Sequence, residues 1–357
     1  MARAALTSRS VAPVSVAGRS IGAGHPCFVI AEAGVNHNGD PALAHRLIEV
    51  AASAGADAVK FQTFRTEALV SRHAPKAPYQ VETTGGAESQ LEMLRKLELS
   101  RETFGSLAEA CRKRGILFLS SPFDLASADD LESLGVAAFK TGSGELTNLP
   151  LLEHLAAKRK PIIVSTGMAT LEEVATAVSA VGGRAPLALL HCVSAYPAPP
   201  EETNLRAMDT LRARFDCPVG FSDHTPGLTV SVAAVALGAT IIEKHFTVDR
   251  SLPGPDHRAS LDPTELTALV AAVREVEASL GDGVKRPTPA ELPTRAVARK
   301  SLVAARALRR GEALTATSVA VKRPGTGIPP GELARALGRR LRRDVEEDEV
   351  IDWTMLE

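Results

Sequence analysis

Eight short apolar runs, several of them rich in Val and Ile, recur along the chain and constrain its fold more than any other feature. Most are separated by segments with the period of an amphipathic helix, such as PALAHRLIEVAASAGA (41–56). Strands that alternate with helices pair in parallel, because each helix returns the chain to the same end of the sheet. The runs are FVIAEAG (28–34), AVKFQTF (58–64), LFLSSPF (117–123), AAFKTGS (137–143), PIIVSTG (161–167), LALLHCV (187–193), PVGFSD (218–223) and TIIEKHF (240–246).

Eight strand–helix units over about 250 residues are typical of a (β/α)₈ TIM barrel, an α/β fold. A doubly wound open sheet is the competing architecture, but no G-x-G-x-x-G fingerprint follows the first run. We expect the barrel over residues 19–283, after a loose leader at 1–18. A linker at 284–299, rich in proline and charge, then leads to a small β-rich domain at 300–357.

Composition is that of a globular protein, with 45% hydrophobic and 23% charged residues. No apolar run approaches the ~20 residues needed to cross a bilayer, so we expect no membrane partner. Four cysteines lie far apart in the sequence and form no C-x-x-C pair: Cys27, Cys111, Cys192 and Cys217. They are typical of small buried side chains in a reducing compartment, although a free thiol nucleophile is the alternative. The expected location is the cytoplasm.

The net charge of −1 hides a strongly basic stretch. Residues 286–343 hold 14 Lys and Arg against three Glu, and an acidic cluster follows at 344–352. Such a stretch fits nucleic acid, an anionic small substrate or a solvated surface. A nucleic-acid-binding protein is the non-catalytic alternative, but interleaved aromatic residues and helix-turn-helix or zinc patterns are missing. We therefore expect no nucleic-acid partner.

Polar residues collect where the apolar runs end, which is where a barrel of this kind carries its catalytic groups. Burying so many polar side chains without a purpose would be costly, so their recurrence predicts an active site there. These residues are Glu32, Lys60, Gln62, Ser120, Ser121, Lys140, Ser143, Glu145, Ser194, Tyr196, Ser222, Asp223, His224, Glu243, Lys244 and His245.

His224 and His245 follow the last two strands, so their side chains can converge at the barrel mouth. Two imidazoles suit a divalent metal that takes its other ligands from water and substrate, although hydrogen-bonded core histidines fit equally well. Lys60, Lys140 and the nearby serines are donors of the kind that a phosphate demands. Metal beside phosphate indicates a polarised carbonyl electrophile and a phosphorylated carbon nucleophile. A lysine Schiff-base aldolase on the same barrel is the competing enzyme.

Long motifs occur in a fixed order over nearly the whole chain after about residue 18: FVIAEAGVNHNGD, AGADAVKFQTF, ESQLEMLRKLELS, KTGSGELTNLPLL, STGMATLEEV, LLHCVSAYPAP, GFSDHTPG, EKHFTVDRSLPGPDHRASL and VKRPGTGI. In these motifs the chain resembles the N-acetylneuraminate (sialic acid) synthases and their legionaminic and pseudaminic acid relatives. The resemblance implies a TIM barrel joined to an antifreeze-like (SAF) domain in a domain-swapped homodimer. It also implies condensation of phosphoenolpyruvate with N-acetylmannosamine to N-acetylneuraminate and phosphate, with Mn²⁺, or else Mg²⁺ or Co²⁺.

The resemblance also assigns roles to individual positions. It implies that His224 and His245 bind the metal, and that Glu32 and Asp256 act on metal-bound water. Ser121 and Ser194 stand where threonine and asparagine can occur, and both retain hydrogen-bonding ability. The alternative is a legionaminic acid synthase acting on 2,4-diacetamido-2,4,6-trideoxymannose, with pseudaminic acid and 9-phosphate synthases as less favoured readings. The implied substrate-binding residues are Lys60, Gln62, Ser121, Lys140, Ser143, Glu145, Ser194, Tyr196, Ser222 and Arg323.

Overall fold

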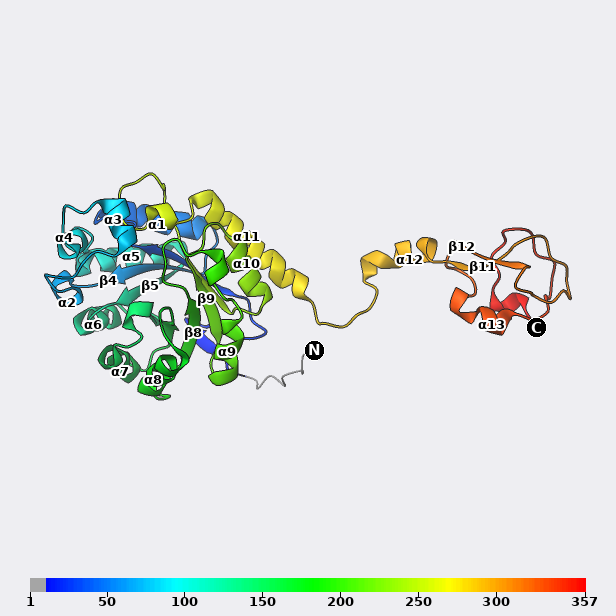
Figure 1. Ribbon diagram of the computed structural model, residues 1–357, viewed down its shortest axis with the longest axis horizontal. Coiled ribbons are helices and arrows are strands. Elements are labelled where there is room, and N and C mark those ends of the chain that lie inside the picture. The colour runs from blue at the N-terminus through cyan, green and yellow to red at the C-terminus, as the bar shows by residue number, and fades with distance from the viewer. Residues whose placement is uncertain (1–10) are drawn as a thin grey trace. The chain divides into compact units, whose positions relative to one another are not determined.

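A computed structural model describes residues 11–357 and divides the chain into two compact units, one ending at Gly281 and the other Asp282–Glu357. The first unit is the predicted barrel of eight parallel strands (Figure 1). The strands run side by side in the order β5-β4-β3-β10-β9-β8-β7-β6, and β5 also contacts β6, so the ring is nearly closed. They are β3 (Phe28–Gly34), β4 (Ala58–Thr63), β5 (Leu117–Pro122), β6 (Phe139–Thr141), β7 (Ile162–Ser165), β8 (Leu187–Cys192), β9 (Val219–Asp223) and β10 (Ile241–His245).

Helices surround this barrel (Figure 1). Several begin at a side chain that accepts a hydrogen bond from a free backbone N–H, as Ser100 does from Thr103 and Asp262 from Glu265. The long helices are α1 (Pro41–Ser53), α5 (Arg101–Arg114), α6 (Leu125–Ser133), α7 (Leu149–Ala157), α8 (Leu171–Val181), α9 (Ala207–Arg214), α10 (Thr229–Ala236) and α11 (Pro263–Leu280). Between β4 and α5 lie three short ones, α2 (Thr66–Leu69), α3 (Pro78–Thr84) and α4 (Gln90–Arg95). Single 3₁₀ turns are η1 (Ser143–Glu145), η2 (Pro200–Glu202) and η3 (His257–Ala259).

Successive side chains of a strand point to opposite faces, and this alternation builds two cores. Side chains such as Val29, Phe61 and Phe221 belong to the large cluster that includes the helices. The intervening apolar residues form a second cluster, which fills the barrel interior toward the amino-terminal ends of the strands. On six of the eight strands the inward residue two positions further along is polar, so a polar layer lies next to the apolar one, nearer the carboxyl ends of the strands. The pairs are Ile30 and Glu32, Ala58 and Lys60, Leu119 and Ser121, Ala138 and Lys140, Ile163 and Ser165, and Ile241 and Glu243.

The N-terminal segment differs from the expected loose leader. Residues 1–10 lie outside the described part of the chain, but β1 (Val14–Val16) and β2 (Arg19–Ile21) pair as an antiparallel hairpin. Val14, Val16 and Ile21 are buried in the same cluster as the inner apolar layer of the barrel. The hairpin forms because this alternation of apolar side chains gives it one face that can cover the apolar layer.

The second unit has a core of its own, built around Leu302, Leu308, Leu341 and Ile351. It contains the antiparallel strands β11 (Ser301–Ala304) and β12 (Val319–Lys322), helix α13 (Leu333–Ala336) and the turns η5 (Pro330–Glu332) and η6 (Trp353–Met355). The stretch expected to be a linker holds η4 (Pro289–Glu291) and helix α12 (Leu292–Ala298), because proline is well tolerated in the first turn of a helix. No helix within residues 11–357 has the length and apolarity to cross a membrane.

Because β9 approaches its neighbouring strands closely at Gly220, we expect a methyl group added there to destabilise the barrel. A Cβ atom at Gly220 would overlap the Ile241 carbonyl oxygen and lie 2.8 Å from Leu190 Cδ2. We expect Gly220→Ala to lower the free energy of unfolding of the barrel by about 1–3 kcal/mol, as overpacking does. The control is Gly105→Ala in α5, where the added atom meets only Leu134 Cδ2 at 3.8 Å. Urea unfolding of both variants measures this, and an unchanged midpoint for Gly220→Ala would contradict it.

Candidate active site

A buried carboxylate lies between two buried lysines in the polar layer of the barrel. Glu243 on β10 has Oε1 3.4 Å from Lys140 Nζ and Oε2 3.8 Å from Lys60 Nζ. The Ser222 hydroxyl also donates to Glu243 Oε1 at 3.0 Å. All of these side chains come from inward positions near the carboxyl ends of strands, so the predicted gathering of polar groups at this end of the barrel is observed.

Each lysine has further partners around the barrel wall. Lys60 Nζ lies 2.7 Å from Glu32 Oε2 and donates to Ser121 Oγ at 3.0 Å. Lys140 Nζ donates to Ser165 Oγ at 2.7 Å and to its neighbour's carbonyl oxygen, that of Thr141, at 2.8 Å. Two ammonium groups therefore lie in a ring of carboxylates and hydroxyls that can exchange with the oxygens of an anionic ligand.

Burial and pairing separate the pKa values of the two carboxyl groups. Burial raises the pKa of Glu32 to about 7, although Lys60 acts in the opposite direction. Burial would also raise the pKa of Glu243, but Lys140 and Lys60 together lower it to about 2. Near neutral pH Glu243 is therefore ionised, while Glu32 readily gains or loses a proton. When Glu32 is protonated and both lysines are charged, the cluster carries a net positive charge and can accept an anion.

Two histidines lie beside this cluster, as the sequence predicted. The rings of His224 and His245 have centroids 5.4 Å apart, and the ring of Tyr196 packs against both. His224 Nδ1 donates to the Val193 carbonyl oxygen at 2.7 Å, because a carbonyl can only accept. Burial would lower the pKa of His224, but Cys192 and the Val193 carbonyl act more strongly and raise it. Whenever the ring is neutral, it keeps a lone pair on Nε2. Burial, with His224 and Lys60, lowers the pKa of His245 well below its usual range, so this ring is neutral.

The two imidazoles could bind a divalent cation whose remaining ligands do not come from the protein. Within residues 11–357, His245 Nδ1 and Asp256 Oδ1 are buried without a hydrogen-bond partner, and a positive charge on His224 lowers the pKa of the Asp256 carboxyl. Between residues 11 and 357, no three His, Cys, Asp or Glu side chains are grouped closely enough to hold a metal ion. Two imidazoles are therefore the protein's contribution, and oxygens from water and a ligand would supply the rest.

Asparagines of the motif VNHNGD position the loop that carries Asp256. The Asn36 side-chain amide donates to the Phe246 carbonyl oxygen at 2.8 Å and to Ser260 Oγ at 2.9 Å, and Ser260 Oγ donates to the backbone oxygen of Asp256 at 2.7 Å. Asn38 Nδ2 donates to the Pro253 carbonyl oxygen at 2.8 Å. This loop follows β10, so the first strand of the barrel fixes the loop after the last one.

Two serines converge on Gly167, which follows β7. The Gly167 N–H donates to Ser143 Oγ at 3.0 Å. A Cβ atom at this position would overlap Ser194 Oγ and lie 2.7 Å from Ser143 Oγ, so only glycine leaves room for both hydroxyls. One of these hydroxyls, that of Ser143, also forms a hydrogen bond with the Cys192 thiol, and Lys140 acts on the same thiol electrostatically.

The structure places most of the predicted site residues together. Lys60, Lys140, Ser121, Ser222 and Glu32 share the ion cluster, and the histidines lie beside it. Gln62 lies beside Glu32 and His245, and the three side chains meet at Gly34. A Cβ atom built on Gly34 would lie 3.3 Å from Glu32 Oε1, 3.4 Å from His245 Cε1 and 3.5 Å from Gln62 Nε2. Glu145 shares η1 with Ser143 and accepts a hydrogen bond from Asn148 Nδ2 at 2.7 Å.

Four of the residues that the sequence singled out are not part of this cluster. Ser120 alternates with the inward Ser121, and its hydroxyl shares a hydrogen bond of 2.7 Å with Thr63 Oγ1. Asp223 and Lys244 alternate with the inward residues and pair with each other, with Oδ2 and Nζ 3.0 Å apart; Asp223 Oδ2 also accepts from Ser231 Oγ at 2.5 Å. They stabilise the start of α10 and the neighbouring strand. Arg323 lies in the second unit, where its Nε donates to the Ala298 carbonyl oxygen at 3.1 Å.

Sequence reasoning assigned no role to several residues of the site. Glu243 and Cys192 were recognised only as a polar strand end and a buried thiol, yet Cys192 Sγ lies 3.8 Å from His224 Nδ1. Ser165 and Asn36 were not singled out at all. The alternation of strand residues could have found Ser165 and Glu243, because both fall on the inward face together with their predicted neighbours.

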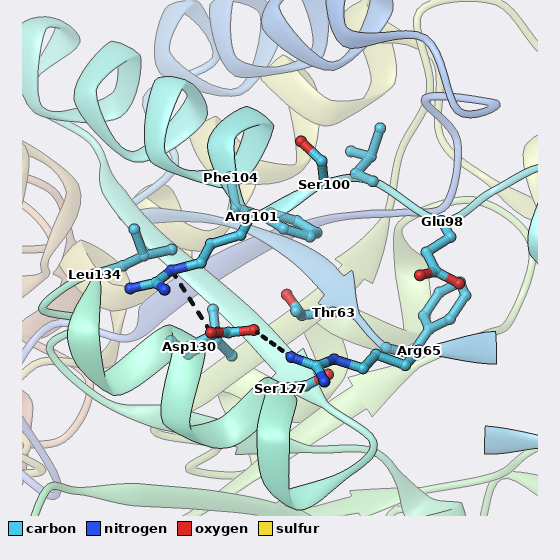
Figure 2. A pocket seen from close by; sticks show the side chains of 12 residues that line it. Thr63, Arg65, Glu98, Ser100, Arg101, Phe104, Ser127, Asp130 and Leu134 are labelled. Carbon is cyan, nitrogen blue, oxygen red and sulfur yellow. Dashed lines mark hydrogen bonds and ion pairs between the residues drawn. The ribbon is translucent and has the colours of Figure 1, made fainter. Parts of the chain in front are cut away.

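A separate cavity of about 140 Å³ lies outside the barrel, between the first turns of α5 and α6. Figure 2 shows Arg65 and Arg101 reaching Asp130 from two sides, with Nη2 of Arg65 3.2 Å and Nε of Arg101 3.6 Å from its carboxylate oxygens. Glu98, on the rim, accepts from Thr66 Oγ1 at 2.6 Å. The charges of this cavity are already satisfied within the protein, so the barrel mouth is the better candidate site.

Fold and site together define an enzyme that works at the mouth of a (β/α)₈ barrel and carries a second, smaller domain. The model of the NeuB family matches residues 47–285, and that of the SAF domain matches 299–357. The chain belongs to the NeuB family.

Relatives that match nearly the whole chain are named as enzymes of sugar-acid synthesis. The N,N'-diacetyllegionaminic acid synthase of Legionella pneumophila is 47% identical over 94% of this chain and 96% of its own. The enzyme of the same name from Campylobacter jejuni is 47% identical over 91% of this chain and 98% of its own. Among solved structures, the N-acetylneuraminic acid (sialic acid) synthetase of Leptospira borgpetersenii superposes with a TM-score of 0.70 at 37% identity, covering 79% of this chain and 94% of that one.

The buried Asp256 predicts how the stability of the metal-free protein depends on pH. Burial raises the pKa of Asp256 to about 6, whereas the unfolded chain has the ordinary value near 3.8. The native state then binds this proton more tightly than the unfolded chain does. Ionisation of Asp256 therefore lowers the free energy of unfolding as the pH rises from about 4 to 6. In Asp256→Asn that fall should disappear, which stabilises the variant by about 3 kcal/mol at pH 8. Urea unfolding from pH 4 to 8 measures the difference; parallel curves would contradict it.

Proposed function

We propose that the protein is a nonulosonic acid synthase that condenses phosphoenolpyruvate with an N-acylated mannosamine-type sugar and water, releasing inorganic phosphate. The observation that carries this proposal is the cluster of Lys60, Lys140 and Glu243 directly beside the pair His224 and His245. The cluster suits a small ligand with two anionic groups, and the histidine pair suits a cation that binds a carbonyl oxygen. A lysine Schiff base is less favoured, because both lysines are held in ion pairs.

The acceptor that we favour is a diacetamido trideoxymannose. N-acetylmannosamine was the first expectation from the sequence, with the diacetamido sugar as its alternative. The two relatives at 47% identity are both named N,N'-diacetyllegionaminic acid synthases, and this reverses the order. N-acetylmannosamine stays as the second candidate, because the structural neighbour at 37% identity is named a sialic acid synthetase.

Lys60 and Lys140 would bind the phosphate and carboxylate groups of phosphoenolpyruvate, replacing their present contacts with serines and carboxylates. Hydroxyls around the same space would donate the remaining hydrogen bonds, since a phosphate offers several acceptor oxygens. Because these donors are fixed by the strands before the ligand arrives, they lose little freedom on binding. The hydroxyls are those of Ser121, Ser143, Ser194 and Ser222.

His224 and His245 would hold a divalent ion, Mn²⁺ or a similar metal, whose chemistry is to polarise the aldehyde oxygen of the open-chain sugar. The methylene carbon of phosphoenolpyruvate then forms the new C–C bond with the aldehyde carbon. Water adds to the former enol carbon, and the C–O bond to phosphate breaks. Glu32, whose pKa is raised to about 7, and Asp256, whose pKa is raised to about 6, are suited to take the proton from water and return one to the alkoxide.

The C-terminal unit would act on the barrel of a second copy. Arg323, exposed in this chain, would reach over the sugar in a domain-swapped homodimer, as the resemblance implied. The apolar side chains of the connecting stretch support assembly, because Val284, Leu292 and Val297 are 61%, 52% and 63% exposed in the single chain.

Replacing either metal-binding histidine should abolish metal-dependent turnover. We expect His224→Ala and His245→Ala to lower phosphate release with Mn²⁺ at least 100-fold, because each variant leaves a single imidazole. Binding of Mn²⁺ alone, followed by titration calorimetry, should weaken in parallel. The control is His154→Ala, a half-exposed residue on α7 that pairs with Asp129. Full activity in both site variants would remove the metal from this scheme.

The acceptor is tested by measuring phosphate release with phosphoenolpyruvate and several sugars in parallel. The panel contains 2,4-diacetamido-2,4,6-trideoxymannose, N-acetylmannosamine and N-acetylmannosamine 6-phosphate. We expect the highest kcat/KM for the diacetamido sugar, with N-acetylmannosamine second. A clear preference for N-acetylmannosamine would reverse the assignment of the acceptor, and no release with any sugar would refute the synthase itself.

A further inference from the structure

The only two tyrosines of the chain pack against each other, with their rings tilted, next to the histidine pair. Tyr79 lies on α3, in the segment between β4 and α5, and Tyr196 follows β8. Their ring centroids are 5.0 Å apart, with 31° between the ring planes. Tyr196 in turn packs on His224 at 4.1 Å and 36°. Both tyrosines are half-buried, so part of each ring remains open to a ligand.

The order of the rings places Tyr79 at the far end of a bound acceptor. This step rests on the proposed function, in which the reacting aldehyde lies at His224 and His245. Tyr196 is the first ring beyond the histidines and Tyr79 is the second, so Tyr79 faces sugar atoms remote from the reacting carbon. The proposed acceptors differ at C4, where the diacetamido sugar carries an acetamido group in place of a hydroxyl. They also differ at C6, where one ends in a methyl group, one in a hydroxymethyl group and one in a phosphate.

The surroundings of Tyr79 suit an uncharged group. Burial raises the pKa of its hydroxyl, and the Asp256 carboxyl adds to this effect, so the ring is neutral and lies near an acid. The nearest lysine along the chain, Lys76, donates to Thr84 Oγ1 at 2.9 Å and to the Gly85 carbonyl oxygen at 3.0 Å, and it also pairs with Glu88. That cation is therefore used to hold α3 in place.

We propose that Tyr79 is a specificity-determining residue, whose ring face packs against the 6-methyl group of the acceptor. The ring offers an apolar surface that a methyl group can cover, whereas a hydroxymethyl group must give up water to do so. Discrimination by one such group in an apolar contact is worth about tenfold or more in kcat/KM. The ring does not touch the reacting carbon, so it acts on acceptor binding.

The test compares Tyr79→Ala and Tyr79→Phe in the full chain with Mn²⁺. Both are assayed with phosphoenolpyruvate and the same three sugars. We expect Tyr79→Ala to raise KM for the diacetamido trideoxy sugar about tenfold and to cut its preference over N-acetylmannosamine by a similar factor. KM for phosphoenolpyruvate should stay within about twofold, and Tyr79→Phe should behave like the wild type. Val81→Ala, an exposed position on the same helix, is the matched control.

Each outcome decides the proposal. Unchanged sugar preference in Tyr79→Ala, with normal turnover in the wild type, overturns the role of Tyr79 and leaves the proposed function intact. Loss in Tyr79→Phe equal to that in Tyr79→Ala overturns the ring contact, because the hydroxyl would then be the recognised group. An equal rise in KM for phosphoenolpyruvate and sugar in Tyr79→Ala identifies a structural role instead. No turnover of any sugar by the wild type refutes the proposed function and this inference with it.

Discussion

The pairing of Glu243 with Lys60 and Lys140 inside the barrel is the interaction on which the site depends. Three charges in such a space are costly to remove from water, and each is tolerated only because the others are present. The same pairing keeps the lysines pointing into one volume rather than out to solvent. An anion that enters can replace the carboxylates as the partner of the lysines without any movement of the strands. This preorganisation distinguishes the barrel interior from a cluster of lysines on a protein surface.

The loops are less strongly fixed than the strands, and the structure compensates for this at Asp256. Its loop is tied to the segment after β3 through Asn36, Ser260 and Asn38, while the β4–α5 segment is tied through Lys76 and Gln80. The hydrogen bond of Asn36 is buried and those of Lys76 and Gln80 are half-buried, whereas that of Asn38 is exposed. Asp256 and Tyr79 therefore face the barrel mouth from two loops that are far apart in sequence.

Much of the barrel could be predicted from the sequence, because each strand is a short apolar run bounded by helical periodicity. His224, His245 and the two lysines could be predicted for the same reason, since they end such runs. The inward position of Glu243 follows from strand alternation, but its ion pairs could not be predicted, because the distances to residues on β4 and β6 are encoded in no local pattern. The packing of Tyr79 against Tyr196 was equally hidden, because it joins a short helix inside a long loop to the end of β8. The N-terminal hairpin was missed because its strands have only three residues each.

The register between β9 and β10 links the two halves of the site. Ser222 lies opposite Glu243 and Asp223 opposite Lys244, so the next pair is His224 and His245. Inward residues two apart on one strand are separated by about 6–7 Å, and this spacing sets the distance from the anion cluster to the histidine pair. A slip of one residue would turn Asp223 and Lys244 inward and move both histidines and Glu243 to the helix side. One strand pair thus determines how far a cation at the histidines lies from an anion at the lysines, which is the spacing that joining two substrates requires.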